Sequence, residues 1–432
     1  MARKETDMRL AWMTAGARSD PARARLARPG TAVLLAALAV ELVDELLDGT
    51  KGAAMPLIRH DLGLNYVQVG LLTAVPLIVG SALELPMGVL SGSGARRRRF
   101  ILGGGLAFIA AVLAAGLARS FDVLVIALTV FFPASGAFVS LTQAALMDAA
   151  PDRQAQHMAR WTLAGSTGAV AGPLLAAAVL IAGGTWRLAF VIVAAAAAVA
   201  WVAVAVTNRG RRGQPSQPGI GTSAEPGAAL ASSAPEDADN DNGWPGWRPA
   251  FALVRRSGAL RWLTLLEVSD LLLDVLTAFL AVYLVAVAHA SPTVAALGVA
   301  VRLGAGLAGD MILIRLLEHW DGRRLLRASV PLALGLFPAL LLVPGIGPKL
   351  GVLAALTLAT APWYPVLSAE LYGSLPGHSG LAVSLTRAAS LVGGLGPLVV
   401  GLLAQRLGLG LAMASLCVAP IAMLAVPRAR SR

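Results

Sequence analysis

About twelve apolar stretches, each long enough to cross a lipid bilayer as a helix of about 20 residues, fill most of this chain. A soluble domain cannot bury that much apolar surface, because 57% of the 432 residues are hydrophobic and only 14% are charged. We therefore predict an all-α membrane protein with twelve transmembrane helices. The expected spans are 31–57, 65–91, 99–118, 121–148, 158–183, 187–206, 260–288, 292–317, 325–344, 347–373, 379–405 and 409–427.

Residues 207–248 separate the first six stretches from the last six and are rich in Pro, Gly, Ser and Asp. A segment of this composition has too few apolar groups to form a packed core. We predict a disordered cytoplasmic linker at 207–248 between six-helix bundles at 31–206 and 249–427. Residues 1–30 are basic and lack the apolar core of a secretory signal, so they are predicted to be a disordered cytoplasmic tail, with 428–432 as a second cytoplasmic tail.

Clusters of Lys and Arg alternate along the chain with loops that carry only isolated bases. Short cytoplasmic loops are enriched in Lys and Arg, so the clustered side is predicted to be cytoplasmic, with both termini there, in a bacterial inner membrane. The net charge of +11 does not indicate nucleic-acid binding, since the bases lie in short loops and tails. The clusters are the N-terminal tail, Arg96–Arg99, Arg209/Arg211/Arg212, Arg323/Arg324/Arg327 and Arg428/Arg430/Arg432.

Two of the apolar stretches carry the same acidic pattern, E-x-x-D-x-x-x-D. The first copy begins at Glu41 and includes Asp44, and the second begins 226 residues later at Glu267 and includes Asp270. An acidic side chain at the bilayer centre costs about 2.5–3.5 kcal/mol on insertion scales, so such residues usually have a function.

Other features recur between the two halves and indicate that one membrane unit is present twice. Parallel six-helix repeats of this kind characterise one large transporter architecture. At the offset of 226 residues Glu84 matches Asp310 and Arg97-Arg98 match Arg323-Arg324, while Gly172-Pro173 recur as Gly396-Pro397 at an offset of 224.

Each acidic set forms a stripe along one side of its helix, within an arc of about 100° for the first and about 60° for the second. A charged stripe cannot face lipid, so both are predicted to line an interior cavity. Clustered carboxylates can share and release protons, and we expect proton coupling, with Asp44 and Asp270 as the best-centred pair. The predicted coupling residues are Glu41, Asp44, Glu45, Asp48, Glu267, Asp270 and Asp274.

Salt bridges are the alternative interpretation of some of these acids. Lys51 could hold Asp48, and Arg302 could hold Asp270 or Asp274. Arg302 could instead bind an anionic group of a substrate, although we favour neutralisation of an acid.

The loop after the second stretch reads Gly88-Val-Leu-Ser-Gly-Ser-Gly-Ala-Arg96-Arg97-Arg98. It resembles the G-x-L-x-D-R-x-G-R-R loop of the major facilitator superfamily, and the resemblance covers residues 31–427. Gly92 and Ser93 replace the Asp and Arg of the family, whereas the second copy keeps an acid at Glu318, followed by Asp321-Gly322-Arg323-Arg324. The resemblance implies two pseudo-symmetric six-helix halves, braced on the cytoplasmic side by these loops.

The fifth stretch contains Gly165-Ser-Thr-Gly168-Ala-Val-Ala-Gly172-Pro173. It is similar to the G-x-x-x-G-P motif of the antiporter branch of that family, which carries drugs and metabolites. The motif is also compatible with a general packing groove, because small residues four apart let helices approach closely.

The remaining candidates fall into two groups, which are substrate contacts and gating or structural residues. Aromatic rings can bind cations, so Trp363 and Tyr364 are predicted to contact substrate, with Gln143 and Arg302 as polar contacts. The gating or structural candidates are Gly88, Arg96, Arg97, Arg98, Gly168, Gly172, Pro173, Glu84, Asp310, Glu318, Arg323, Arg324 and Arg387.

These patterns favour a proton-coupled secondary transporter that exports a cationic, zwitterionic or neutral amphipathic drug-like molecule or metabolite by antiport. Coupling to sodium, uptake by proton symport and a transporter-like sensor remain open. We expect no enzyme, because no HExxH, P-loop or GxSxG motif occurs, and the single Cys417 offers no cysteine metal site. We also expect no metal, no cofactor and a monomer.

Overall fold

The structure is a computed structural model that describes residues 30–91, 95–149, 154–209, 258–374, 385–386, 389 and 392–426. This part of the chain is helical and joined by short loops. The predicted tails and linker lie outside the described residues, except that helix α9 continues to Arg209, into the predicted linker.

The first half contains seven α-helices and one π-helical turn within the described residues. α6, the π-helix η1 and α7 follow one another without a break and match one predicted span. The elements are α3 (Thr31–Asp61), α4 (Tyr66–Ser91), α5 (Ala95–Gly116), α6 (Phe121–Ser135), η1 (Gly136–Ser140), α7 (Leu141–Asp148), α8 (Gln154–Ile181) and α9 (Trp186–Arg209).

The second half ends in a run of short helical pieces that together match the last predicted span. Its elements are α12 (Ala259–Ala286), α13 (Pro292–Leu317), α14 (Gly322–Leu342), α15 (Ile346–Thr360), α16 (Trp363–Gly373), α18 (Gly396–Leu407), α19 (Leu409–Ala414), η3 (Ser415–Cys417), α20 (Val418–Ala422) and η4 (Met423–Ala425).

Eight helices among the described residues are long and apolar enough to cross a membrane, which confirms the all-α membrane class. α3 is not among these eight, although it has 31 residues, and it carries the acidic stripe and Lys51. Part of the predicted span 379–405 lies outside the described residues. The count of twelve spans therefore stays a prediction.

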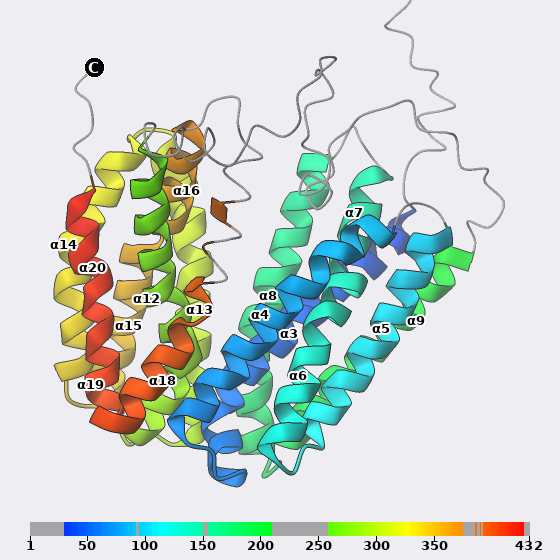
Figure 1. Cartoon of the computed structure of the whole chain (residues 1–432), viewed down its shortest axis with the longest axis horizontal. Coiled ribbons are helices and arrows are strands. Elements are labelled where there is room, and N and C mark those ends of the chain that lie inside the picture. Colours follow the sequence, from blue (N-terminus) through cyan, green and yellow to red (C-terminus); the bar gives the residue numbers. More distant parts are fainter. Residues whose placement is uncertain are drawn as a thin grey trace, which may run out of the picture.

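The helices form two bundles, with α3–α9 in one and α12–α20 in the other (Figure 1). The bundles meet at one end and separate toward the end at which α7 and α16 are labelled. Contacts between the bundles join α3 to α12 and α13, α8 to α13, and α4 to α18. The acidic helices α3 and α12 thus lie next to each other at the centre of the molecule.

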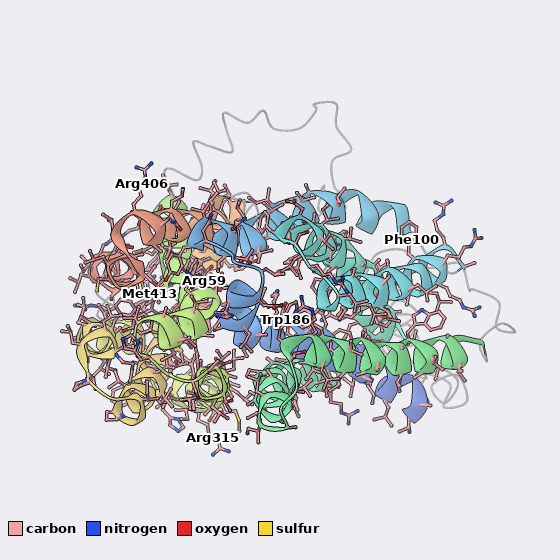
Figure 2. All side chains as sticks on the ribbon, turned by 90° about the horizontal axis from the view of Figure 1, so that it is seen from below. Arg59, Phe100, Trp186, Arg315, Arg406 and Met413 are labelled. Atoms are coloured by element: carbon pink, nitrogen blue, oxygen red, sulfur yellow. The ribbon has the colours of Figure 1, made fainter. Side chains whose placement is uncertain are left out.

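At the end where the bundles meet, α4 and α18 approach each other through glycines. A Cβ atom on Gly70 would overlap the Pro397 backbone, and one on Gly401 would overlap the Tyr66 carbonyl. The Tyr66 amide also donates a hydrogen bond of 3.3 Å to Gln405 Oε1. Figure 2 views the molecule from this end. These contacts close the molecule on the side opposite Arg96–Arg99.

An ion pair joins three elements of the first bundle at the same end. Asp61, beyond the predicted span 31–57, pairs with Arg187 and accepts a hydrogen bond of 3.1 Å from Trp186 Nε1. Arg187 also donates a hydrogen bond of 2.8 Å to the Ala118 carbonyl. The hydrogen bond from Arg187 is the main reason that the pKa of Asp61 lies below its ordinary value. Asp61 therefore keeps the charge that holds α3 against α9.

Lys349 is a buried cation that holds the end of α14 in the second bundle. It is only 5% exposed. Its Nζ donates a hydrogen bond of 2.5 Å to the Leu340 carbonyl and one of 3.3 Å to the Leu341 carbonyl. Tyr283 Oη lies 3.4 Å from the same nitrogen. Because the last carbonyls of a helix have no partner within it, Lys349 satisfies groups that would otherwise be unpaired.

We predict that Lys349→Met lowers the free energy of unfolding by about 1–3 kcal/mol, because buried carbonyls lose their donor. Thermal unfolding of the purified protein in detergent measures this effect. Arg406→Met is the control, since Arg406 is an exposed cation at the same end of the molecule. Equal unfolding temperatures for the two variants would contradict the capping role.

Candidate functional site

Asp44 in α3 is held by a serine from another helix. Ser135 Oγ donates a hydrogen bond of 2.8 Å to Asp44 Oδ1. Ser135 is the last residue of α6, directly before the π-helix η1, and Pro133 lies one turn or less before that point. Single π-helical turns are frequent at functional sites, because they reorient the side chains of one helix face. Here the local change of helix type occurs at the residue that contacts Asp44.

Asp48, one turn further along α3, is neutralised on its own helix. Lys51 Nζ lies 2.6 Å from Asp48 Oδ1, and the same ammonium lies 6.0 Å from the Phe132 ring centroid. The spacing of three residues brings the two side chains to one face of the helix. The salt bridge considered from the sequence is therefore present.

The other two acids of α3 face α8. Glu41 is in contact with Gly165, where an added Cβ would lie 2.6 Å from Glu41 Oε1, and Trp161 is within hydrogen-bonding reach of the same carboxylate. The Cβ atom of Glu45 lies close to Gly168. The glycines of α8 thus make room for acidic side chains.

The same glycines bring the backbones of α3 and α8 into direct contact. A Cβ atom on Gly168 would overlap the Leu42 carbonyl, and one on Gly172 would overlap the Leu46 carbonyl. Thr50 Oγ1 lies 3.2 Å from the Gly172 carbonyl across this interface. Pro173 lies inside α8 and has no N–H, which frees the carbonyl four residues earlier. The Gly-Pro motif therefore packs against the segment of α3 that carries the acids.

In the second bundle, Asp270 occupies the position that matches Asp44 in the sequence repeat. Ser269 Oγ lies 3.4 Å from Asp270 Oδ1 and 2.7 Å from the Leu266 carbonyl. A serine hydroxyl is thus the polar neighbour of both matched acids. Among the described residues, neither Asp44 nor Asp270 forms an ion pair with a basic side chain.

Asp274, which matches Asp48, has a basic neighbour from another helix. Arg302 of α13 is 7% exposed, donates to the Leu273 carbonyl and interacts electrostatically with Asp274. Lys51 and Arg302 are thus the basic neighbours of Asp48 and Asp274, although they come from unrelated positions in the repeat. This placement agrees with the expectation that Arg302 neutralises an acid.

Glu267 is the acid that matches Glu41, and it contacts the segment before α18. An added Cβ on Gly393 would lie 2.6 Å from Glu267 Oε2. Its Oε1 atom is buried and has no hydrogen-bond partner within the described ranges. Although the two stripes bring many carboxylates together, no group of three His, Cys, Asp or Glu in the described residues is arranged to hold a metal ion.

The predicted substrate contacts lie in different surroundings. Trp363 is fully buried, and its Nε1 donates a hydrogen bond of 2.9 Å to Ser329 Oγ. Its ring is therefore part of the core of the second bundle. Tyr364 is 52% exposed, so its ring is accessible. Gln143 of α7 donates a hydrogen bond of 3.4 Å from its Nε2 to Met158 Sδ of α8.

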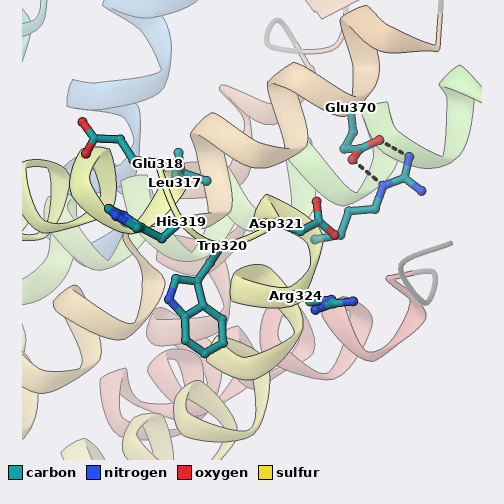
Figure 3. Close-up of a pocket in the computed structure, with 8 residues that line it drawn as sticks. Leu317, Glu318, His319, Trp320, Asp321, Arg324 and Glu370 are labelled. Atoms are coloured by element: carbon teal, nitrogen blue, oxygen red, sulfur yellow. Dashed lines mark hydrogen bonds and ion pairs between the residues drawn. The ribbon is translucent and has the colours of Figure 1, made fainter. Parts of the chain in front are cut away.

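The basic loop of the second half is braced within its own bundle. Arg323 forms a bidentate ion pair with Glu370 of α16 (Figure 3). The Arg323 guanidinium also lies 5.3 Å from the Trp262 ring centroid. Arg323 and Glu370, together with Glu318 and Arg324, line a pocket of about 740 Å³ at the end of the bundle. Both of these contacts of Arg323, with Glu370 and Trp262, lie within the second bundle.

The other gating candidates are only partly described. Arg96 is exposed, Arg97 is buried, Arg98 is half-buried and Asp310 is exposed. The side chain of Glu84, the surroundings of Gly88 and the whole of Arg387 lie outside what the structure describes.

Sequence reasoning missed four residues that contact the predicted site or loop. They are Ser135, Ser269, Trp161 and Glu370. Ser269 could have been found, since it directly precedes Asp270, and Pro133 was a signal of irregular helix near Ser135. The positions of Trp161 and Glu370 depend on how the helices pack.

Comparison with known proteins gives one family. The model of the Major Facilitator Superfamily matches residues 46–369. Among curated proteins no match is found. Solved structures with the same fold share little sequence, so they show the fold alone.

Three of these structures span nearly the full chain. A bacterial homolog of the human lysosomal transporter Spinster, inward-facing and unoccupied, has a TM-score of 0.69 and 16% identity, with 92% of this chain and 98% of that chain covered. The nucleoside transporter NupG has a TM-score of 0.66 and 11% identity, with 92% of this chain and 99% of that chain covered. An auto-inhibited POT family peptide transporter has a TM-score of 0.66 and 14% identity, with 93% of this chain and 97% of that chain covered.

We predict that Gly168→Ala destabilises the protein by about 1–3 kcal/mol, because the added methyl group overlaps the Leu42 carbonyl. Gly52→Ala on α3 is the matched control, since a Cβ atom there meets nothing within 4 Å and alanine favours helix by about 0.5–1 kcal/mol. Thermal unfolding in detergent compares the two. The interface is misassigned if Gly168→Ala is as stable as Gly52→Ala.

Proposed function

Since this chain belongs to the major facilitator superfamily and is therefore a transporter rather than an enzyme, we propose that it exports a small molecule in exchange for protons. The proposed substrate is cationic, zwitterionic or neutral and amphipathic, because a pathway lined by acids disfavours strongly anionic molecules.

The observation that carries this proposal is the difference between the two matched pairs of acids. Within the described parts of the chain, Asp48 and Asp274 each have a basic neighbour, whereas Asp44 and Asp270 have a serine hydroxyl and no basic side chain. A carboxylate in a membrane protein without a counter-ion must be stabilised by a proton or by a bound cation. Asp44 and Asp270 are therefore the groups for which protons and substrate compete.

That competition gives exchange transport a simple physical basis. When the site faces the cytoplasm, a cationic group of the substrate displaces one proton from the pair Asp44 and Asp270. When it faces outward, a proton displaces the substrate. Each proton lost is replaced by one positive charge of the substrate, so the net charge of the site is the same with either occupant when the protein changes conformation. The serine hydroxyls can donate to the ionised form and accept from the protonated form.

The arrangement of the bundles supports an inward-open state of this cycle. The bundles separate on the side of Arg96–Arg99, which the positive-inside rule assigns to the cytoplasm (Figure 1). We propose twelve spans in two six-helix halves, both termini in the cytoplasm, a bacterial inner membrane and a monomer. The domain boundaries are those inferred from the sequence.

The packing of α8 supports coupling between protonation and movement of the two halves. Gly165, Gly168 and Gly172 lie against the acidic segment of α3, so a change of charge on Glu41 or Glu45 acts directly on this interface. The same helix contacts α13 of the other bundle. A helix that touches both the acids and the opposite half can link protonation to movement of the halves.

We predict that Asp44→Asn and Asp270→Asn each reduce proton-driven flux at least ~10-fold, because an amide can neither release a proton nor bind a cation as a carboxylate does. The measurement is uptake of a substrate panel into proteoliposomes that contain an internal pH dye. The control removes Asp48 and Lys51 together, as Asp48→Asn with Lys51→Met, and is expected to keep coupling, since it removes a pair without net charge. Substrate flux without proton movement, unaffected by either single variant, would refute proton coupling.

The direction of transport is tested separately in vesicles of opposite orientation. We expect a proton gradient, acid outside in the cell, to drive accumulation into inverted vesicles and not into right-side-out vesicles. The reverse result would assign uptake by symport to the same residues.

A further inference from the structure

Arg302 is a buried cation that uses only part of its hydrogen-bonding capacity. One guanidinium nitrogen donates to the Leu273 carbonyl, while the buried Nε has no hydrogen-bond partner among the described residues. A guanidinium carries five N–H donors, and a buried donor without a partner is unfavourable. The buried Nε–H of Arg302 is therefore free to bind an acceptor.

Asp274 does not fill that position in this structure. It interacts electrostatically with Arg302, but the described residues include no direct ion pair between the two side chains. Asp274 is an exposed residue of α12. The acid therefore balances the charge of Arg302 without saturating its donors.

Asp270 lies one helical turn before Asp274, which places it about 6 Å away along α12. Asp270 has no basic partner in the described part of the chain, and Arg302 has an unused Nε–H donor. A negative group and a positive group about one turn apart are complementary to a molecule that carries both charges. A simple cation would use only the first of these groups.

We propose that Arg302 is an anion-binding subsite of the transport pathway, and that the substrate is a zwitterion whose cationic group binds Asp270 and whose carboxylate binds the Arg302 guanidinium. This inference rests on the proposed function and narrows its substrate class. When the carboxylate binds, Asp274 turns toward its exposed side. Arginine suits this role because its planar fork binds a carboxylate through two parallel hydrogen bonds.

Two quaternary ammonium probes test the subsite, because their positive charge does not depend on pH. Butyltrimethylammonium is a cation, and 4-(trimethylammonio)butanoate adds one carboxylate at the other end. Calorimetric titration of the purified full chain in detergent gives both affinities. We expect wild type to bind the zwitterion at least ~10-fold more tightly than the cation, as for a hydrogen-bonded charged group.

The decisive variant is Arg302→Gln combined with Asp274→Asn, which removes both charges together and avoids an unpaired buried acid. It is expected to bind the cation within ~3-fold of wild type and to lose the preference for the zwitterion. Arg302→Lys keeps the positive charge but lacks the planar guanidinium, and it is expected to lose part of the preference for the zwitterion. This variant tests the subsite if the double variant does not fold.

Equal affinity of wild type for the two probes, binding of neither probe, or an unchanged preference in both variants would overturn the proposal. Failure of the proposed function is seen in a different experiment. If proton-coupled flux is unaffected by Asp44→Asn and Asp270→Asn, the coupling role fails, whereas the zwitterion preference concerns Arg302 alone.

Discussion

The energetic cost of carboxylates inside a membrane is the constraint on which the arrangement of this molecule depends. α3 and α12 are long helices of a membrane protein, and their acids can be tolerated only where other helices or water receive them. α6 supplies a hydroxyl, α8 supplies glycines that make room, and α13 supplies a guanidinium. The rotation of the two helices about their axes is thus fixed by where their charges can be compensated. The acids of α3 are thus received within the first bundle and those of α12 within the second, on two helices that contact each other across the bundles.

Two kinds of helix contact coexist around this centre. The contact of α3 with α8 lies within one bundle, and its glycines bring two backbones together along several turns. The contact of α4 with α18 joins the two bundles at one end, through Gly70 and Gly401. The first holds the acids in place, whereas the second can open without unfolding either bundle. A transporter that alternates its access needs both a permanent and a separable interface.

Much of the fold could be predicted from the sequence, because each apolar stretch reflects the thickness of the bilayer. The span predicted at 121–148 and the observed run from Phe121 to Asp148 coincide, even though a π-helix lies inside it. The ion pair of Asp48 and Lys51 could also be predicted, since a spacing of three residues brings the two side chains to one face of the helix. The family resemblance was confirmed by the match over residues 46–369.

What the sequence could not provide depends on packing between distant segments. Ser135 lies 91 residues from Asp44, and Glu370 lies 47 residues from Arg323, so no local pattern connects either pair. Trp363 and Tyr364 are neighbours in sequence, yet one is buried and the other exposed, because α16 turns only one face to its bundle. The most direct test of the central claim is to count the protons that purified protein releases into weakly buffered detergent when a transported cation binds. Wild type is predicted to release protons and the Asp44→Asn/Asp270→Asn double variant none, and an equal release from both would contradict the role of these two acids.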